Sequence, residues 1–586
     1  MKQHSIIALV LLGALSLGCV KEEVAGQAGH DKVVTLTTTV SLAEAPGTKA
    51  LTAEGVKTFA VGDQVAIVYT NTADATVKAV SAPLVAEDIA SDGKMATLTV
   101  TLTDPAPSGA VRYIYPAAMA KETVASDATI DDESTVDFSR LATQDGTLAS
   151  LASGLDLAVF DGTLTADAAL PASVTLTNPL TICEFNIKNG GNDITAGITM
   201  MTVFDGTNAY IVNRAAGAGP IYVAMQPVGS NKTLQFCATD GTTSYRKQVT
   251  GKTLAAGNMY PVNLTMPTET RTCLELLTDD HTLQDGETLT GVLLGKYEIK
   301  TSTEQNDTPV TVTLDGVDIN STIADKTLGA GIMCEGNTIL QLADGSDNKV
   351  KGRSAGYAGV YIKKERTLTI RGNGSLIAIG TRKSPNSGAG IGGYGKLGCG
   401  SIVIESGAIV AQGSYGSAGI GTGFYGIISN TGITKTITGG DITIEGGNVT
   451  AMGGNNGAGI GTGYAKTNSV AAKQYCSTNN QCGNISISGG TVEATGGSGA
   501  AGIGCGTVNN DYSLADVSNT CGTITITKGV TRVTATKGND APYSIGKGDK
   551  DGFYGRQTCG TITIGGVDKG TDGVNPDSGD TYVYQP

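Results

Sequence analysis

A six-residue block that returns five times in the C-terminal half constrains this chain more than any other feature. Each block has glycine at its second position and isoleucine at its fourth and sixth positions. The blocks begin at residues 399, 439, 482, 521 and 559, so the period is 38–43 residues. Self-similarity at a period of about 20–50 residues is typical of solenoids, propellers and repeat arrays.

Two further segments accompany the block. All blocks but the last are followed by a β-branched residue two positions before an alanine, and each unit also carries a version of Ala-Gly-Ile-Gly. Three short strands per unit, separated by glycine-rich corners, predict a parallel β-helix in which equivalent side chains stack. A propeller, the alternative, needs four antiparallel strands per unit. We expect the helix over 273–575, a tail over 576–586, and an inward ladder of Ile402, Ile442, Ile485, Ile524 and Ile562.

Four cysteines share one position of the repeat. These are Cys399, Cys482, Cys521 and Cys559, which we interpret mainly as small buried apolar residues stacked on one another. Disulfides between neighbouring coils, such as Cys521 with Cys559, or staples of the corner loops are the alternatives. The chain has no CxxC pair and only three histidines, so we expect no zinc site.

The N-terminal half has a different pattern. From about residue 33 to 266, short segments rich in Thr, Val and Ile alternate with period two, and Asp-Gly or Asn-Gly turns separate them. This pattern is typical of half-buried antiparallel strands in β-sandwiches. The stretch is long enough for two sandwiches, which we place at 33–150 and 151–267.

The first residues read as an export signal. A cationic start, an apolar run over 6–17 and Gly18-Cys19 define a secretory signal over 1–18. The run is too short to cross a bilayer, which needs about 20 apolar residues. Leu15-Ser-Leu-Gly-Cys19 resembles a lipobox, which implies acylation of Cys19, a lipidated tether over 19–32 and partnership with outer-membrane lipid; an ordinary signal with a chance cysteine is the alternative. Lys21-Glu22-Glu23 resembles the export tag of surface lipoproteins in the Bacteroides group.

The net charge of −14 argues against nucleic acid or anionic lipid as a partner, because both demand a cationic face.

Three motifs in the N-terminal half resemble fimbrillin-like proteins of Bacteroides and Porphyromonas. They are Phe59-Ala-Val-Gly-Asp63, Arg112-Tyr-Ile-Tyr-Pro116 and the stretch 254–264. The resemblance implies two transthyretin-like sandwiches, so the expected fold class is all-β: two transthyretin-like β-sandwich domains followed by a parallel β-helix. In the family a protease releases the first strand, often after arginine, and a partner subunit fills the groove. This chain has no arginine before Arg112, which favours an accessory or tip subunit over a stalk subunit.

The C-terminal half resembles the glycine-rich β-helices called carbohydrate-binding-domain proteins, which implies glycan binding. The match rests on Gly-Ala-Gly-Ile-Gly, on Ile-Thr-Ile-x-Gly-Gly-x-Val-x-Ala and on the stretch 336–350. Members sometimes bind calcium, and Asp344, Asp347 and Asn348 could supply oxygen ligands. A turn rich in Asp and Asn explains these residues as well, so we expect no metal and no cofactor.

The candidate ligand site lies at the corners of variable length. All of them fall between the Gly-Ile-Gly segment and the next block, and insertions confined to one corner of a solenoid commonly form its binding face. They contain aromatic residues that could stack on sugar rings or could simply pin each loop to the body: Tyr394, Phe424, Tyr425, Tyr464 and Tyr512.

The sequence therefore predicts a surface lipoprotein that acts as an adhesin or glycan-binding protein on the outside of the outer membrane. Its partner would be a glycan or another ligand of a host or biofilm surface. A fimbrial accessory or tip subunit, with fimbrial subunits as partners, is the alternative. A polysaccharide lyase-like enzyme is the second alternative, but no acidic set recurs beside the basic cluster at 363–371, and we expect no catalytic residue.

Overall fold

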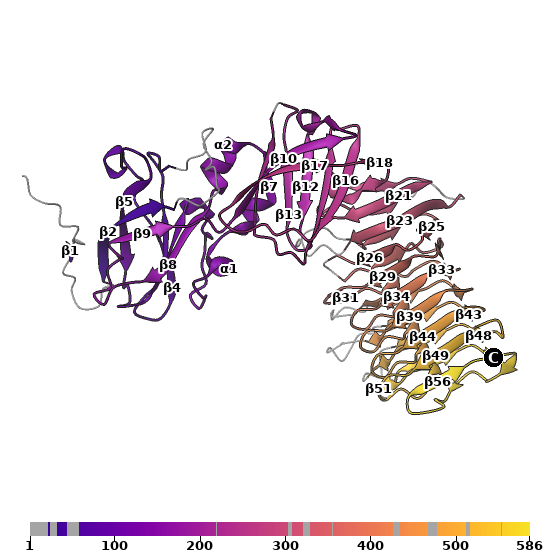
Figure 1. Ribbon diagram of the computed structural model, residues 1–586. Coiled ribbons are helices and arrows are strands. Elements are labelled where there is room, and N and C mark those ends of the chain that lie inside the picture. Colours follow the sequence, from indigo (N-terminus) through magenta and orange to yellow (C-terminus); the bar gives the residue numbers. More distant parts are fainter. Residues whose placement is uncertain are drawn as a thin grey trace, which may run out of the picture. The chain divides into compact units, whose positions relative to one another are not determined.

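A computed structural model describes residues 22–23, 32–43, 58–217, 219–302, 308–319, 329–353, 356–395, 397–425, 434–466, 477–510, 516–551 and 554–586. The chain divides into two compact units, 1–269 and 270–586. Almost all regular structure is β (Figure 1), which confirms the all-β prediction. Among the described residues, no helix has the length and apolar character needed to cross a bilayer. Residues 1–18 and Cys19 lie outside the described residues.

Two sheets form the first sandwich of the N-terminal unit. One contains β2 (Val33–Leu42), β5 (Met95–Thr103) and β9 (Ser173–Leu176), and the other has the order β4-β3-β6-β8. Strands β2 and β5 alternate strictly between buried and exposed residues, so one face of that sheet packs into the core. The bounds of the second sheet are β4 (Thr76–Val80), β3 (Ala66–Thr70), β6 (Ala110–Tyr115) and β8 (Ala158–Thr163). Within the expected tether, β1 (Glu22–Glu23) pairs with β2.

The second sandwich also has two sheets. One contains β10 (Thr181–Asn189), flanked by β14 (Ile221–Met225) and, in parallel, by β17 (Met259–Thr265), with β11 (Asn192–Asp193) at its end. The other has the order β18-β16-β15-β12-β13-β7, with bounds β18 (Thr268–Glu269), β16 (Ser244–Thr250), β15 (Thr233–Thr239), β12 (Met200–Phe204), β13 (Ala209–Asn213) and β7 (Thr143–Gln144).

The two sandwiches exchange strands along the sequence. Strand β7 pairs with β13 of the second sandwich, whereas the later strands β8 and β9 return to the first. Sequence reasoning placed one cut at residue 150, but no single cut separates the strands of the two sandwiches. The connecting segment contains the short helices α1 (Asp132–Thr135) and α2 (Leu148–Ser150), and its Leu141 and Leu151 pack in the core of the second sandwich.

Parallel coils build the C-terminal unit. In the first four of the five repeats, the block strand and the strand after it both enter a long sheet, and the fifth block contributes its block strand. The five Gly-Ile-Gly segments enter a second parallel sheet. The block strands are β33 (Ser401–Ile404), β38 (Ile442–Ile444), β43 (Ile485–Ile487), β48 (Ile524–Ile526) and β53 (Ile562–Ile564). The strands after them are β34 (Ala408–Gln412), β39 (Asn448–Met452), β44 (Thr491–Thr495) and β49 (Arg532–Thr536), and the Gly-Ile-Gly strands are β32 (Ile391–Gly392), β35 (Ile420–Gly421), β40 (Ile460–Gly461), β45 (Ile503–Gly504) and β50 (Ile545–Gly546).

Earlier coils use the same three positions with a looser sequence. The long sheet begins with β19 (Thr272–Cys273), β21 (Glu287–Val292), β23 (Val310–Ile319), β25 (Thr338–Leu342), β26 (Asp347–Lys351), β28 (Thr367–Gly372) and β29 (Ser375–Ile379). The second sheet begins with β20 (His281–Leu283), β22 (Ile299–Thr301), β24 (Ile332–Cys334) and β27 (Val360–Ile362).

The register of the coils confirms the predicted ladder. Ile402 pairs with Ile442, which pairs with Ile485, and the series continues through Ile524 to Ile562. All five side chains are buried in one continuous core. Equivalent residues therefore lie above one another, as the parallel β-helix requires.

The second glycine of each Gly-Ile-Gly segment is required by close contact with the equivalent residue of the next coil. Gly421 and Gly461 both have φ +134°, a backbone conformation that side chains disfavour. A Cβ on Gly421 would lie 2.0 Å from the carbonyl oxygen of Gly461, and a Cβ on Gly461 would lie 1.9 Å from that of Gly504. The coils can stack at this corner only because both residues lack a side chain.

The last coil is covered by antiparallel strands. Strand β54 (Val567–Asp568) pairs with β53, β55 (Gly573–Val574) pairs with β50, and β56 (Thr581–Tyr584) pairs with β49. Residues 576–586, expected as a tail, thus include a strand of the long sheet. The partners of Tyr582 and Tyr584 are Ala535 and Val533, so the chain end takes part in closing the helix.

Candidate functional site: the corner sheet of the β-helix

The long corners of the repeat form a sheet of their own. Their final residues are β37 (Thr434–Thr438), β42 (Ser477–Cys482), β47 (Asp516–Cys521) and β52 (Arg556–Cys559), which pair in parallel in that order. We call these four strands the corner sheet. The first residues after Gly-Ile-Gly also pair, as β41 (Ala465–Lys466), β46 (Val508–Asn509) and β51 (Lys550–Asp551). The insertions therefore do gather on one flank of the helix.

The inner side of the corner sheet is attached to the coils by buried amides. Asn480, Asn519 and Gln557 are in register. The Asn519 side chain donates to the carbonyl oxygens of Gly506 and Thr507 at 2.8 and 3.0 Å. The Thr507 carbonyl oxygen also accepts from the backbone N–H of Ala465 at 3.0 Å, and the Gly506 carbonyl oxygen accepts a second amide, that of Gln557, at 2.9 Å. These bonds keep the corner carbonyls supplied with donors, and a buried carbonyl without a donor is costly. The amides therefore fix the distance between the corner sheet and the Gly-Ile-Gly turns.

The outer side of the corner sheet carries two rows of polar side chains, all of them uncharged except Arg556 at the end of the first row. Along β42 and β47, buried residues alternate with partly exposed ones, so the partly exposed side chains face outward. We call these two rows the polar rows. In register they are Thr436, Asn479, Ser518 and Arg556 for the first row, and Thr438, Gln481, Thr520 and Thr558 for the second.

Hydrogen bonds order the polar rows. Ser518 Oγ donates to Asn479 Oδ1 at 2.7 Å, and the hydroxyls of Thr520 and Thr558 lie 2.9 Å apart. The first row ends in Arg556, which pairs with Asp516 at 2.5 Å and remains 67% exposed. The rows thus offer hydroxyls and amides, which both donate and accept hydrogen bonds, at the interstrand spacing of about 4.8 Å.

Two of the predicted ligand-binding aromatics are buried. Phe424, in β36 (Phe424–Tyr425), is 7% exposed and Tyr464 is 5% exposed. Their rings stack on one another, with centroids 5.3 Å apart and an interplanar angle of 22°. Since neither ring presents a face to solvent, the expectation of an exposed aromatic row has to be corrected at these two positions. The stack instead supports the alternative that aromatic residues pin the corners to the body.

The remaining predicted aromatics lie apart from that stack or outside the described residues. Tyr394 is partly buried and packs against Tyr357 and Tyr361, with ring centroids 4.1 and 4.9 Å away. Burial, together with the neighbouring tyrosines, raises the pKa of Tyr394. Tyr425 is partly exposed, and Tyr512 lies outside the described residues.

One cation covers an aromatic beside the Phe424 stack. The guanidinium carbon of Arg382, in β30 (Arg382–Lys383), lies 4.1 Å from the ring centroid of Tyr415. Tyr415 in turn contacts Phe424 edge-on, with centroids 5.8 Å apart.

The stacked cysteines are free thiols in this structure. Cys482, Cys521 and Cys559 are neighbours in register. Hydrogen bonds with the other two sulfurs, together with burial, raise the pKa of Cys521 well above that of an ordinary thiol. Burial likewise raises the pKa of Cys399 to about 12. Thiols with a raised pKa are poor nucleophiles, which for Cys399 and Cys521 agrees with the interpretation of a buried apolar ladder, whereas the hydrogen bond with Cys521 lowers the pKa of Cys559.

The Asp-rich turn is occupied by its own hydrogen bonds. Asn348 is buried, and its Oδ1 accepts from the backbone N–H of Val317 at 3.0 Å. The Ser375 hydroxyl donates to Asp347 Oδ1, and the Asn373 amide donates to Asp344 Oδ1. These oxygens thus support the turn and the neighbouring coil, which is the simpler of the two explanations offered by the sequence.

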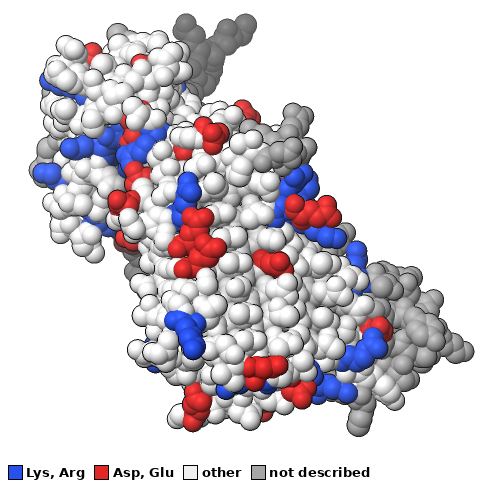
Figure 2. All heavy atoms as spheres, turned by 90° about the vertical axis from the view of Figure 1, so that its right-hand side faces the viewer, with Lys and Arg blue, Asp and Glu red and all other residues white. Residues whose placement is uncertain are grey.

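Uncharged residues cover most of the face shown in Figure 2, and the charged residues there lie in small mixed groups. A surface of this kind has no extended field of one sign, which is what a polyanionic or polycationic ligand would require.

No family model and no curated protein matches the chain. Among solved structures, a fimbrial assembly protein from Parabacteroides distasonis is similar at 11% identity and TM-score 0.25, covering 39% of this chain and 90% of that one. A putative cell adhesion protein from Bacteroides uniformis has 14% identity, TM-score 0.23 and coverages of 40% and 97%. The tip fimbrial protein Mfa3 from Porphyromonas gingivalis, with C-terminal truncation, has 10% identity, TM-score 0.19 and coverages of 39% and 94%. Similarity at these values carries no functional assignment.

Proposed function

We propose that this chain is a non-enzymatic surface adhesion protein whose β-helix binds a neutral glycan on the polar rows of the corner sheet. The observation that carries the proposal is the register of these rows, which repeats hydroxyl and amide groups on three adjacent strands in the first row and on four in the second. A polysaccharide also repeats its hydroxyl groups along one direction. A regular array of groups that donate and accept can therefore form several hydrogen bonds to one ligand at once.

The rigidity of the rows favours binding. Their inner neighbours are held by buried amides such as Asn480 and Asn519, which are fully buried, so the outward side chains start from a fixed backbone. Preorganisation of this kind lowers the entropy lost on binding. Within this proposal the buried rings of Phe424 and Tyr464 support the corner. Tyr394 and Tyr425 remain candidates for direct contact with a sugar among the described residues, and Tyr512, outside them, stays a candidate as predicted.

The proposed location is the outside of the outer membrane, with Cys19 acylated and the leader 1–18 removed. Partners would be a glycan of a host or biofilm surface and outer-membrane lipid. A fimbrial accessory subunit remains the second candidate, because the resemblance of residues 30–266 to fimbrillin-like proteins implies it. The third candidate, lyase activity, lacks support at the basic cluster: Lys363 pairs with Glu335 at 3.2 Å, and Arg371 donates to Gln341.

A glycan array probed with residues 20–586 tests the proposal. We expect binding to neutral polysaccharides, and we expect the triple variant Asn479→Ala, Gln481→Ala, Thr520→Ala to weaken it by about tenfold or more, since each lost hydrogen bond contributes about 0.5–1.5 kcal/mol. The matched control is Thr443→Ala with Thr525→Ala, which removes outward hydroxyls from the block strands β38 and β48. Equal binding by the triple variant and the control would reject the corner sheet as the site.

Co-purification of the full chain with fimbriae tests the fimbrial role. That role is favoured if deletion of the sandwiches abolishes the co-purification and if the chain binds no glycan.

A further inference from the structure

A pocket of about 640 Å³ lies between the two sheets of the second sandwich, far along the chain from the corner sheet. We propose that it binds a single-chain anionic amphiphile of the long-chain fatty-acid type, with the chain between the sheets and the carboxylate at two lysines. Its volume is in the range of about 300–1,000 Å³ that is typical of small-molecule sites. The inference is independent of the proposed glycan binding.

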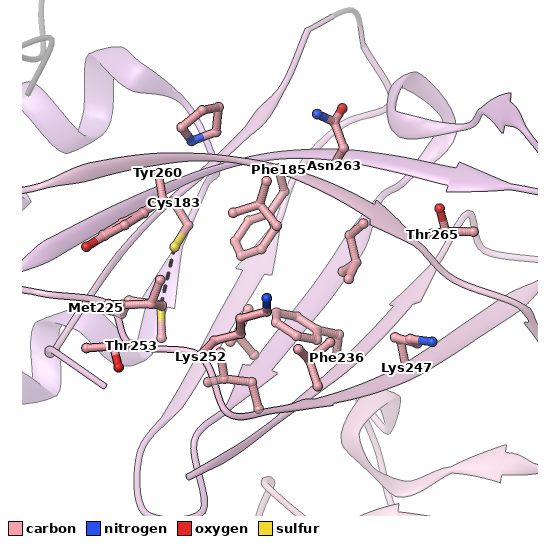
Figure 3. Close-up of a pocket in the computed structure, with 17 residues that line it drawn as sticks. Cys183, Phe185, Met225, Phe236, Lys247, Lys252, Thr253, Tyr260, Asn263 and Thr265 are labelled. Atoms are coloured by element: carbon pink, nitrogen blue, oxygen red, sulfur yellow. Dashed lines mark hydrogen bonds between the residues drawn. The ribbon is translucent and has the colours of Figure 1, made fainter. Parts of the chain in front are cut away.

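The pocket exists because the two sheets end on the same side without joining. Strand β17 pairs with β10 alone, and β16 is covered beyond β15 only by the two-residue strand β18. The lining comes from both sheets and from residues 252–254, which follow β16. Figure 3 shows Cys183, Phe185 and Tyr260 on one side of the space and Phe236, Lys247 and Lys252 on the other.

The floor of the pocket is apolar. Phe185 and Phe236 face each other from opposite sheets with ring centroids 5.7 Å apart, and Met225 and Leu234 lie beside them. All four side chains are buried. Burial of a hydrocarbon chain against this apolar floor is favourable by a free energy of roughly 25 cal/mol per Å². The hydroxyls of a sugar would have no hydrogen-bond partners there.

The rim of the pocket is cationic. Lys247 and Lys252 are exposed and line the pocket, and none of its 17 lining residues is acidic. Neither lysine forms an ion pair among the described residues of the chain. In a chain with net charge −14, two cations without acids above an apolar floor are complementary to a ligand with an anionic head and an apolar body.

A peptide strand fits the same opening less well. Strand addition relies on a continuous edge of backbone donors and acceptors, and the edge strand β17 contains Pro261, which has no N–H. The two lysines would also have no function in such a complex. Charge and edge chemistry together therefore favour an amphiphile over a strand from another chain.

Fluorescence titration with cis-parinaric acid tests the proposal on the full chain. We expect saturable binding of one probe per chain, and binding of its methyl ester that is about tenfold weaker, because the ester lacks the charge that the lysines recognise. Lys247→Ala with Lys252→Ala should weaken binding of the acid by about tenfold and leave the ester unchanged. The matched control is Lys188→Ala, a lysine of β10 outside the pocket lining, which should bind as the parent chain does.

Three outcomes would overturn the proposal: no saturable binding, equal affinity for acid and ester, or a double variant that binds the acid as the parent chain does. Analytical ultracentrifugation tests whether a second copy of the chain occupies the opening instead. A dimer that Lys252→Glu dissociates, in a protein that does not bind the probe, would assign the opening to a second copy of the chain and likewise reject the amphiphile. Glycan binding is unaffected by any of these results, so the two proposals fail separately.

Discussion

The sandwiches and the β-helix are stabilised in different ways. In the sandwiches, individual polar contacts are not repeated along the chain. Arg112 is buried between two carboxylates, and the Gln144 side chain exchanges hydrogen bonds with the backbone of Ala224. In the β-helix the same contact returns in every coil, as the isoleucine ladder and the Gly421–Gly461–Gly504 series show. A single substitution in the helix therefore disturbs two coils, whereas one in a sandwich disturbs a single site.

The largest effect is expected for Gly461→Ala in the β-helix. The new Cβ would lie 1.9 Å from the carbonyl oxygen of Gly504 at φ +134°, so the coils must separate at that corner. We expect the free energy of unfolding to fall by about 4 kcal/mol or more, the range reserved for severe steric or packing defects. Chemical denaturation of the full chain measures the change.

The sandwich control for that change is Gly206→Ala. Gly206 has φ +89°, but a Cβ there would meet no atom within 4 Å, so only backbone strain of about 1–2 kcal/mol should result. Equal losses for the two variants would show that conformational strain, and not contact between coils, dominates at Gly461.

Arg112→Ala should have an intermediate effect in the sandwich. The guanidinium is 3% exposed, and it pairs with Asp132 and, at 3.1 Å, with Asp161. The two carboxylates are about half exposed and stay hydrated after the change, so we expect a loss of about 2–3 kcal/mol, below the full cost of orphaning a buried charge. Thermal and chemical unfolding both report it.

Arg140→Ala is the matched control, because Arg140 is 49% exposed and lies 3.7 Å from Asp137. Surface pairs of this kind contribute about 0–1 kcal/mol. A similar loss for both arginines would contradict the view that single buried contacts hold the sandwich.

The smallest effect is expected at Asp240, in the turn between β15 and β16. Hydrogen bonds from the backbone N–H of Thr243 and from Thr242 lower the pKa of this carboxyl from 3.8 to about 2. A depressed pKa in the folded state means that the stabilisation is present above pH 4 and is lost as the pH falls towards 2. Asp240→Asn keeps an acceptor without the charge, so it should cost less than about 1 kcal/mol at pH 7. Its difference from the parent chain should vanish near pH 2; a difference that persists there would contradict this assignment.

Sequence reasoning was most effective where the chain repeats. The ladder of Ile442, Ile485 and Ile524 could be predicted because a fixed period turns sequence alignment into spatial register. Division of the sandwiches at residue 150 could not capture the return of β8 and β9 to the first sandwich, since short alternating strands carry no information on which sheet they join. The closing strand β56 was missed because no repeat motif precedes it.

At the corners, the location of the insertions could be predicted from the sequence, but the solvent exposure of their aromatic side chains could not. The spacing indicated correctly that the insertions share one flank, but it could not show that Phe424 and Tyr464 stack on each other between coils. The polar rows were overlooked because Thr, Asn and Gln in a corner segment read as ordinary turn residues. The inward positions of these strands include the polar residues Thr478, Asn480 and Asn519, so the sequence shows no clear alternation of polar and apolar residues that would have revealed the rows.

The three antiparallel strands after residue 565 also affect whether copies of this molecule associate with one another. An uncovered coil would present rows of free backbone groups to any neighbour, and like-to-like growth into filaments is the usual result. By reversing direction over each of the three strands β49, β50 and β53, the chain covers the last strands of the long sheet and of the second sheet, on which another copy could otherwise elongate. The molecule can thus remain dispersed even though its interior is built on self-similar stacking.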